Sequence, residues 1–217
     1  MNQRGDSVTG SIRVFIALDL PPQAKEALTR TIGALGQEIS TVVRCVDSSG
    51  IHLTLKFLGN IQPTFTPQVF EAMTQAAQSD HSNTFQLSLS QLGVFPNPRR
   101  PRVLWAGIQG DLTALAGLQI RVEEAAGRIG FAPEQRPYRP HLTLGRVREG
   151  VSPPVCLQIG QVVSEAKLEP SPPWLVDSLH LIRSDRRPAG ATCTSLGSIP
   201  LGASSGAIDG QLSTWIA

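Results

Sequence analysis

The chain has 217 residues, of which 41% are hydrophobic and 17% are charged, and its formal net charge is +2. This length allows one substantial domain or two small lobes with a common core, and it excludes several independent domains. So small a charge excludes the binding of an anionic partner by the whole surface and requires locally clustered basic residues instead. Three cysteines without CxxC spacing favour neither a disulfide framework nor a zinc site, so we expect a reducing, cytoplasmic location.

Residues 1–11 lack the apolar segment of a signal peptide, and residues 14–22 (VFIALDLPP) are too few and too proline-terminated to span a membrane. We therefore expect a flexible N-terminal tail on a protein without a membrane segment. Residues 12–20 are β-branched and aromatic and predict a strand, which ends at two prolines where a helix begins. The helix shows an apolar face at Leu28, Ile32, Leu35 and Ile39.

A histidine precedes the next predicted strand, in HLTLKFLG at residues 52–59. A second helix follows through Val69, Phe70, Met73 and Ala77, and residues 85–95 then alternate between apolar and polar as a half-buried strand does. The pattern then begins again with a strand at 102–108, a helical stripe and HLTLGRV at 141–147. The helical stripe comprises Leu115, Leu118, Val122, Ala125 and Ile129.

The two halves correspond at a constant offset of 89 residues. This offset places Arg13 on Arg102 and Ala17 on Ala106, and it carries His52 to Leu55 onto His141 to Leu144. A short motif can recur by chance, but a motif at the same distance from the same strand start indicates duplication.

The end of the duplicated region is followed by WLVDSLHLIRS and TCTSLGSIPL, which predict a closing hairpin around DRRPAG, and residues 203–217 predict a tail rich in glycine and serine. We expect one bilobal domain over residues 12–202. Its fold class is α+β, with two lobes related by a pseudo-twofold axis, each a mainly antiparallel sheet backed by helices around a central cleft.

The repeated HxT pattern places chemically useful groups on one side of each strand. Side chains alternate along a strand, so His52 and Thr54 face away from Leu53 and Leu55, and the same holds for His141 and Thr143. Two histidines suit displacement at a phosphodiester, because one imidazole takes a proton while the other imidazolium gives one near neutral pH. The threonine hydroxyls suit the non-bridging phosphate oxygens, and no metal is needed.

A single HxT strand is more often a half-exposed structural strand than a catalytic one. Duplication changes this balance, because packing explains why the leucines are repeated but not why His and Thr are repeated on the opposite face. His81 and His180 lack the threonine and a duplicated partner, so we interpret them as surface or packing residues.

The sequence resembles the 2H phosphoesterase superfamily, named for its paired HxTx motifs, and within it the RNA 2′,3′-cyclic phosphodiesterases formerly called 2′-5′ RNA ligases. RVFIALDLP, HLTLKFLGN, LGVFPNPRRPRVLWAGI, RPHLTLGRV and LHLIRS carry the resemblance in the family's order, over roughly residues 12–202. Several agreeing segments are more specific than either motif alone. Cys45 stands near the place of an aromatic residue common in the family, so the sequence departs from the family pattern there.

The resemblance implies hydrolysis of RNA ending in a 2′,3′-cyclic phosphate, with the phosphate left on the 2′ oxygen. It implies that His52 is the proton donor and His141 the proton acceptor, and that Thr54 and Thr143 bind the phosphate. No metal, cofactor or membrane is implied, and we expect a monomer whose partner is RNA with a cyclic phosphate end.

The resemblance also implies substrate binding by the fifth residue after each motif histidine. These are Phe57, suited to stack on a base, and Arg146, suited to pair with phosphate. Simple alternation instead favours core packing of Phe57 and turns Arg146 away from His141 unless the strand bends, which Gly145 permits. The same alternation places Lys56 on the face of His52.

Other residues invite functional interpretations that packing explains as well. Arg99, Arg100 and Arg102 suit a solvated turn that protects sheet edges, with at most RNA backbone contacts outside the cleft. Trp105 and Trp174 lie on apolar strands, and we expect both in the core.

Three further functions compete with hydrolysis of RNA ends. One is 2′-5′ RNA ligation, the reverse reaction, which uses the same residues. Another is noncatalytic binding of RNA ends by the two HxT pairs. The third is hydrolysis of small nucleoside cyclic phosphates or 2′,5′-linked oligonucleotides.

Overall fold

The computed structural model describes residues 10–78, 83–187 and 190–202. The helices in this part of the chain are α1 (Pro22–Ile39), α2 (Thr66–Ala77), α3 (Leu112–Arg128) and α4 (Pro153–Glu165), with short 3₁₀ helices η1 (Ser48–Gly50) and η2 (Pro63–Phe65). The strands are β1 (Ile12–Leu18), β2 (Val43–Cys45), β3 (Leu53–Ile61), β4 (Phe85–Phe95), β5 (Val103–Gly110), β6 (His141–Val147), β7 (Trp174–Val176), β8 (Ser178–Arg187) and β9 (Gly190–Pro200).

The strands form two sheets, and every pairing in them is antiparallel. The four-stranded sheet has the order β3-β1-β8-β9, and the five-stranded sheet has the order β2-β6-β5-β4-β7. The α+β class and the two antiparallel sheets are therefore confirmed. The predicted closing hairpin is present as β8 and β9, whereas WLV forms the separate strand β7 in the other sheet.

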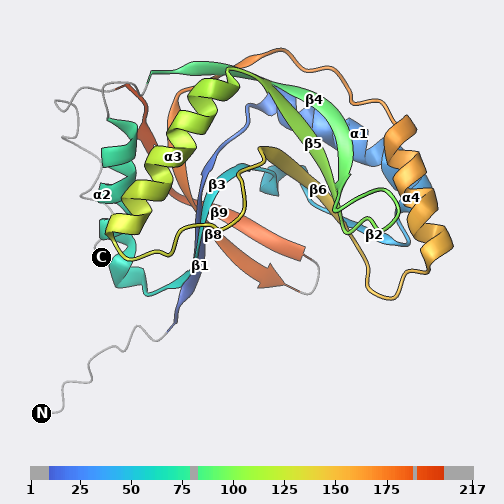
Figure 1. Cartoon of the computed structure of the whole chain (residues 1–217), viewed down its shortest axis with the longest axis horizontal. Coiled ribbons are helices and arrows are strands. Elements are labelled where there is room, and N and C mark those ends of the chain that lie inside the picture. The colour runs from blue at the N-terminus through green and yellow to red at the C-terminus, as the bar shows by residue number, and fades with distance from the viewer. Residues whose placement is uncertain (1–9, 79–82, 188–189, 203–217) are drawn as a thin grey trace, which may run out of the picture.

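The helices cross from the half that encodes them to the other sheet. Helix α1 follows β1 of the four-stranded sheet but packs against β2 and α4, and α3 follows β5 of the five-stranded sheet but packs against β3 and α2. Figure 1 shows the result, with α2 and α3 at one end of the molecule and α1 and α4 at the other. The two repeats are thus interlocked, and neither sheet is built from one repeat alone.

One hydrophobic cluster extends beneath both sheets. It includes Leu53 and Leu55 from the first motif strand and Leu142 and Leu144 from the second, all at most 4% exposed. The helices add apolar side chains such as Leu28 and Leu118, which are fully buried. Burying such a side chain contributes about 1.5–3 kcal/mol, so the repeated leucines are explained by packing alone.

The sequence prediction missed α4. Its first residues are Pro153 and Pro154, which suit the first turn of a helix, and Ile159 and Val163 lie on its buried face. Two apolar residues one turn apart are a weak periodic signal. The predicted tails fall mostly on residues outside the described part of the chain. Among the described residues, none of the helices is long and apolar enough to cross a membrane.

Candidate active site

Both motif strands contain a β-bulge at the same motif position. In the pairing of β1 with β3, Ile16 lies opposite Lys56 and Ala17 opposite Thr54, so Leu55 is the extra residue. In the pairing of β5 with β6, Leu104 lies opposite Gly145 and Trp105 opposite Thr143, so Leu144 is the extra residue. The offset of 89 residues relates Leu55 to Leu144, so the duplication repeats the bulge together with the motif.

The bulge changes which residues share a face, because an extra residue interrupts strict alternation. Phe57 lies opposite Phe15 on β1, and Ala17, two residues farther along β1, lies opposite Thr54. Since residues 15 and 17 point the same way, Phe57 and Thr54 do as well. We call this side of the two sheets the motif face. It carries His52, Thr54 and Phe57 in one sheet and His141, Thr143 and Arg146 in the other.

Phe57 is not a core residue, and its core-packing alternative is wrong. The side chain is 61% exposed and contacts Phe15, with 5.7 Å between ring centroids. Phe15 in turn makes a T-shaped contact with the ring of His52, with 6.0 Å between ring centroids. Phe57 therefore extends an aromatic surface that starts at the first motif histidine.

Arg146 also lies on the motif face and is exposed. The bend that the sequence required is present, but Gly145 is not its cause, since the first copy bends in the same way with Lys56 at that place. Gly145 has another role. A Cβ there would lie 2.8 Å from Cγ1 of Val43, so glycine allows β2 to approach β6.

The prediction that Lys56 shares the face of His52 is wrong, because the bulge turns it inward. Lys56 is 6% exposed, pairs with Glu123 of α3, and donates a hydrogen bond of 2.6 Å to the carbonyl of Ala132. Glu123 also accepts from the backbone N–H of Glu134. This buried lysine therefore ties β3 to α3 and to the loop that leads to His141.

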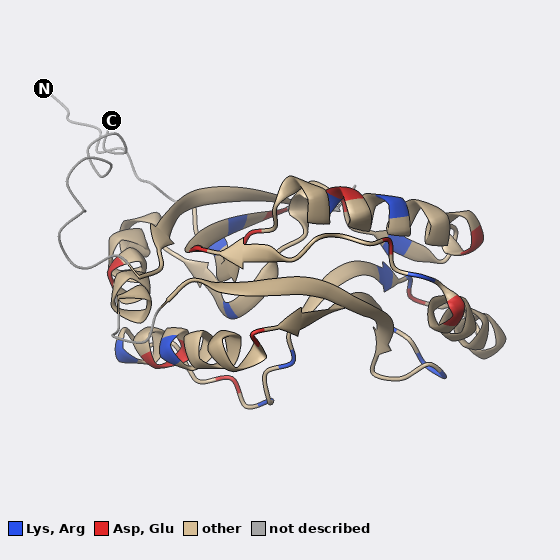
Figure 2. Cartoon of the chain, turned by 90° about the horizontal axis from the view of Figure 1, so that it is seen from above, with Lys and Arg blue, Asp and Glu red and all other residues tan. Residues whose placement is uncertain are grey.

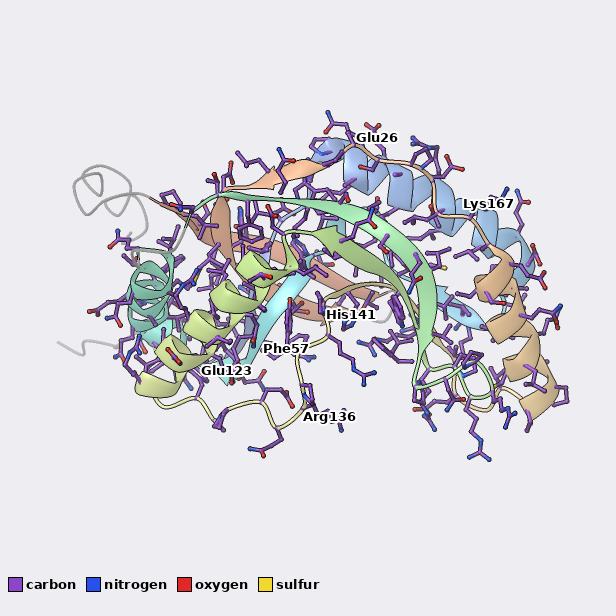
Figure 3. All side chains as sticks on the ribbon, turned by 45° about the horizontal axis from the view of Figure 1, so that its top comes forward. Glu26, Phe57, Glu123, Arg136, His141 and Lys167 are labelled. Atoms are coloured by element: carbon purple, nitrogen blue, oxygen red, sulfur yellow. The ribbon has the colours of Figure 1, made fainter. Side chains whose placement is uncertain are left out.

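The two motif strands meet where the sheets adjoin. Strands β3 and β6 belong to different sheets, but some of their Cα atoms lie within 8 Å of each other. In Figure 3, Phe57 and His141 both lie in the central part of the molecule, between the helices at its two ends. The sequence prediction of two HxT pairs around one space is consistent with this arrangement.

The two motif histidines have the same hydrogen bond on Nδ1. His52 Nδ1 lies 3.1 Å from the carbonyl of Gly50, and His141 Nδ1 lies 2.7 Å from the carbonyl of Arg139. A carbonyl only accepts, so Nδ1 carries the proton in both rings, and Nε2 remains for chemistry. In the first copy Asp47 fixes the supporting turn, because its carboxylate accepts from the backbone N–H of Ser49.

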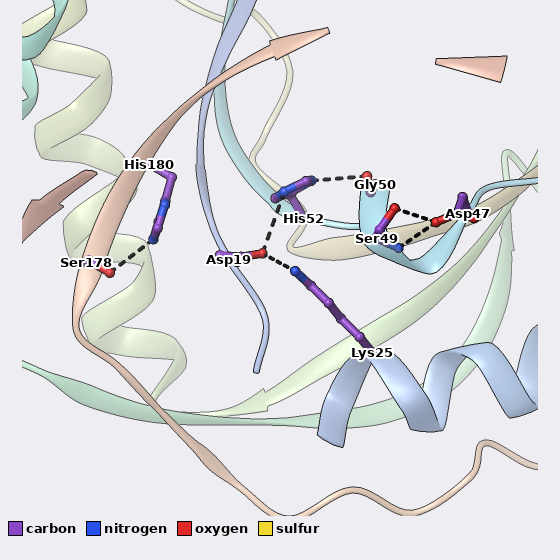
Figure 4. A network of polar contacts seen from close by, with 8 residues as sticks. All are labelled: Asp19, Lys25, Asp47, Ser49, Gly50, His52, Ser178 and His180. Carbon is purple, nitrogen blue, oxygen red and sulfur yellow. Dashed lines mark hydrogen bonds and ion pairs between the residues drawn. The ribbon is translucent and has the colours of Figure 1, made fainter. Parts of the chain in front are cut away.

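His52 has charged neighbours that the sequence did not reveal (Figure 4). Its Nε2 lies 3.6 Å from Oδ1 of Asp19, and the same oxygen accepts a hydrogen bond of 2.7 Å from Lys25. Burial lowers the pKa of His52 below its ordinary value, while the negative charge of Asp19 opposes this effect. Burial alone would raise the pKa of Asp19, but Lys25 and other favourable contacts outweigh it, so that pKa lies below its ordinary value.

His180 lies close to this polar group, a placement that its interpretation as a surface or packing residue did not include. It lies opposite Ala17, which lies opposite Thr54, so it shares the motif face, and its Nε2 is 3.1 Å from Ser178 Oγ. Burial lowers its pKa, and Asp19 acts in the opposite direction. No sequence signal links positions 19, 52 and 180, because strand pairing brings them together. His81 lies outside the described residues.

Aromatic rings flank His141 instead. Phe95 makes a T-shaped contact with its ring and stacks on Trp105, with 5.1 Å between ring centroids in both pairs. Trp105 is half-buried on the motif face opposite Thr143, so the prediction of a core position is wrong for it, whereas Trp174 is 8% exposed as predicted. Arg99 and Arg100 lie in an exposed turn whose backbone N–H groups donate to Asn97.

Residues 46–188, which include both motifs, match the family model of the 2′-5′ RNA ligase superfamily. The chain belongs to this superfamily. A relative from Geobacillus stearothermophilus is named RNA 2′,3′-cyclic phosphodiesterase and is 35% identical over 139 residues, which are 64% of this chain and 43% of the relative. A relative of the same name from Methanothermobacter thermautotrophicus is 29% identical over 185 residues, 85% of this chain and 96% of the relative.

Solved structures of other proteins have the same fold. The crystal structure of a Thermus thermophilus protein superposes with a TM-score of 0.68 at 26% identity, covering 88% of this chain and 98% of that one. Apo LigT of E. coli superposes with a TM-score of 0.66 at 24% identity, covering 89% of this chain and 99% of that one. The α+β fold with two antiparallel sheets, expected from the sequence, is therefore shared with known structures.

Proposed function

We propose that this protein hydrolyses the 2′,3′-cyclic phosphate at the end of an RNA and leaves the phosphate on the 2′ oxygen. One observation carries the proposal: two HxT pairs lie on the motif face at the junction of the sheets, each with its histidine held as the Nδ1–H tautomer. The names of the relatives support the substrate class.

The mechanism uses the free Nε2 atoms in opposite roles. Nε2 of His141 takes a proton from the attacking water, whose oxygen bonds to phosphorus as the bond to the 3′ oxygen breaks. Nε2–H of His52 gives its proton to that leaving 3′ oxygen. Hydroxyls of Thr54 and Thr143 donate to the non-bridging oxygens, where negative charge accumulates. After one turnover the two histidines have exchanged protonation states, and solvent restores them.

The surroundings of the two histidines support this assignment of roles. Burial lowers the pKa of His52, and the Asp19 carboxylate at 3.6 Å opposes this effect, because its charge favours the imidazolium form that a proton donor needs. Among the described residues, His141 has no ion-pair partner, and its neighbours are the ring of Phe95 and the backbone of Arg139. A neutral base needs no adjacent carboxylate.

Residues beside the motifs are proposed to hold the nucleotide. Phe57 offers an exposed ring for a base, since stacking on an aromatic side chain contributes about 1–3 kcal/mol. Arg146 offers a guanidinium for phosphate. We further propose that the enzyme acts without metal or cofactor, as a monomer in the cytoplasm.

The test uses a short RNA with a 2′,3′-cyclic phosphate end, incubated in EDTA with wild type, His52→Ala and His141→Ala. We expect 2′-phosphate product from wild type, resolved from the 3′-phosphate by chromatography, and turnover slower by about 10²-fold or more with either variant. Loss of wild-type turnover in EDTA and its recovery with a divalent ion would contradict the metal-free mechanism. RNA binding without turnover by wild type would favour the noncatalytic function, and joining of RNA ends in preference to hydrolysis would favour ligation.

A further inference from the structure

The five-stranded sheet contains an unusual pair of charges. Apart from His141, the only charged residues in its strands β2, β6, β5, β4 and β7 are Arg44 and Arg146. None of these strands carries an acidic residue. Figure 2 shows the same distribution over the molecule, in which acidic positions gather on helices and loops and the strands are largely uncharged.

The two arginines face each other directly. Arg44 of β2 and Arg146 of β6 are Cα partners in the antiparallel pairing. Side chains in such a pair project from the same face, with Cβ atoms about 4.5–5.5 Å apart. Like charges at this separation destabilise a sheet. Both side chains are exposed, and neither guanidinium has a hydrogen-bond or ion-pair partner among the described residues.

This arrangement suits an anion that both guanidinium groups contact. Each guanidinium presents several N–H donors in a planar fork that matches phosphate oxygens, and a bound phosphate replaces their repulsion by two attractions. The pair lies on the motif face, because Arg146 follows Thr143 on that face and Arg44 lies opposite Arg146. An RNA bound along the motif face can therefore reach the arginine pair.

The other motif strand has no such pair. The offset that relates Arg146 to Phe57 gives an aromatic side chain in the first copy, and Phe15, its neighbour on β1, is also aromatic. One side of the site is thus suited to a base and the other to phosphate. Because Thr54, Thr143 and the two histidines already surround the reacting phosphate in the proposed mechanism, the arginine pair remains for a second phosphate.

We propose that Arg44 and Arg146 form a two-arginine clamp for the phosphodiester on the 5′ side of the terminal nucleotide, so that the enzyme prefers oligonucleotide ends to mononucleoside cyclic phosphates. The clamp rests on the proposed function in that the reacting cyclic phosphate lies between the HxT pairs. Arg44 is its new member. It is a binding residue that does not contact the reacting atoms.

The first test compares two substrates, a trinucleotide with a 2′,3′-cyclic phosphate and a mononucleoside 2′,3′-cyclic phosphate. Arg44→Gln is expected to raise KM for the trinucleotide about tenfold and to leave kcat/KM for the mononucleoside unchanged. Arg44→Lys should recover part of the loss, because it restores the charge but not the planar fork. Arg30→Gln, an equal charge change on the exposed face of α1, is the matched control. It should change neither KM nor kcat/KM for either substrate.

The salt dependence gives a second readout. Loss of one phosphate contact should reduce the slope of log K against log salt by about 0.7 for single-stranded RNA. An equal loss of kcat/KM with both substrates would overturn the clamp. It would mean that Arg44 contacts the reacting phosphate or that it only stabilises the fold. Unchanged kinetics on the trinucleotide in Arg44→Gln would overturn it as well.

A binding experiment separates failure of the clamp from failure of the proposed function. A trinucleotide with ordinary 3′-5′ phosphodiester linkages and an unreactive 3′-hydroxyl end is titrated into wild type, Arg44→Gln and Arg30→Gln, and calorimetry measures the affinity. We expect about tenfold weaker binding by Arg44→Gln only. If wild type hydrolyses no cyclic phosphate, this result still decides whether Arg44 binds an internal phosphodiester, and equal affinity of all three proteins would overturn it.

Discussion

His52 and His141 occupy equivalent places in two copies of one unit, and their differences show what duplication preserves. The bulge, the i−2 carbonyl on Nδ1 and the threonine two residues later are present in both copies. The surroundings of Nε2 are not. His52 lies beside a carboxylate, a lysine and another histidine, whereas His141 lies against Phe95 and has no ion-pair partner in the described part of the chain. The backbone thus repeats the geometry of a proton-transfer group, and nonrepeated neighbours give each copy its role.

Removing one histidine at a time separates the two roles most strongly. His52→Ala and His141→Ala should each reduce kcat/KM by about 10²–10⁴-fold, which is the usual contribution of a general acid or base. The residual activity of His52→Ala should lose the high-pH limb of the bell-shaped profile, since the proton donor is absent. That of His141→Ala should lose the low-pH limb. Identical residual profiles would contradict the division into acid and base.

The threonines should behave alike where the histidines differ. Thr54→Val and Thr143→Val each remove one hydroxyl donor while keeping a β-branched side chain in the strand. By analogy with the loss of one oxyanion donor, we expect about a 10²-fold decrease in kcat and little change in the melting temperature. A change in KM without a change in kcat would assign the hydroxyl to substrate binding only.

The residue that follows HLTL is Lys56 in the first copy and Gly145 in the second, and this difference should appear in stability. Lys56→Met leaves Glu123 and the Ala132 carbonyl without their buried partner. Hydrogen bonds to charged groups contribute about 1.5–3 kcal/mol, so we expect a loss of about 2 kcal/mol, or about 30-fold in the folding equilibrium. Denaturant unfolding measures it. Equal stability of Lys56→Met and wild type would show that this ion pair does not hold α3 on β3.

The neighbours of His52 should shift its titration in opposite directions. Asp19→Asn removes a charge that favours the imidazolium, so the pKa of His52 should fall and the high-pH limb should move to lower pH. Lys25→Met removes a charge that disfavours it, so the limb should move to higher pH. We expect changes of a few-fold in kcat/KM above neutral pH and smaller changes below it.

Direct observation of the imidazole complements the kinetics. NMR titration of the His52 ring should show the same opposite shifts in Asp19→Asn and Lys25→Met. Asp19, Lys25 and His180 all act on the charge of His52. The signal of His180 must therefore be assigned separately from that of His52. Shifts of the same sign in both variants would mean that they act through packing.

The sequence predicted what is local and repeated. The offset of 89 residues identified the motif strands, and the leucines of HLTL were correctly assigned to the core. In the second copy the sequence required a bend to bring Arg146 to the face of His141, and the bulge at Leu144 supplies it. The bulge at Leu55 was not predicted, because alternation assumes a regular strand, and this error alone misplaced Lys56 and favoured burial of Phe57. Asp19 and His180 were missed because the pairing of β1 with β3 brings Asp19 beside His52, and the pairing of β1 with β8 adds His180. Arg44 required the register of β2 on β6.

The interlocked repeats also affect how the chain reaches its native state. Strand β1 needs β8 as its second neighbour, so the four-stranded sheet cannot close until almost the whole described chain is available. Pairings this distant in sequence slow folding, and until β8 arrives during synthesis one edge of β1 is open to incorrect partners. A protein cut between its two copies should therefore yield two fragments that are insoluble apart. Mixed during refolding, they should recover activity together.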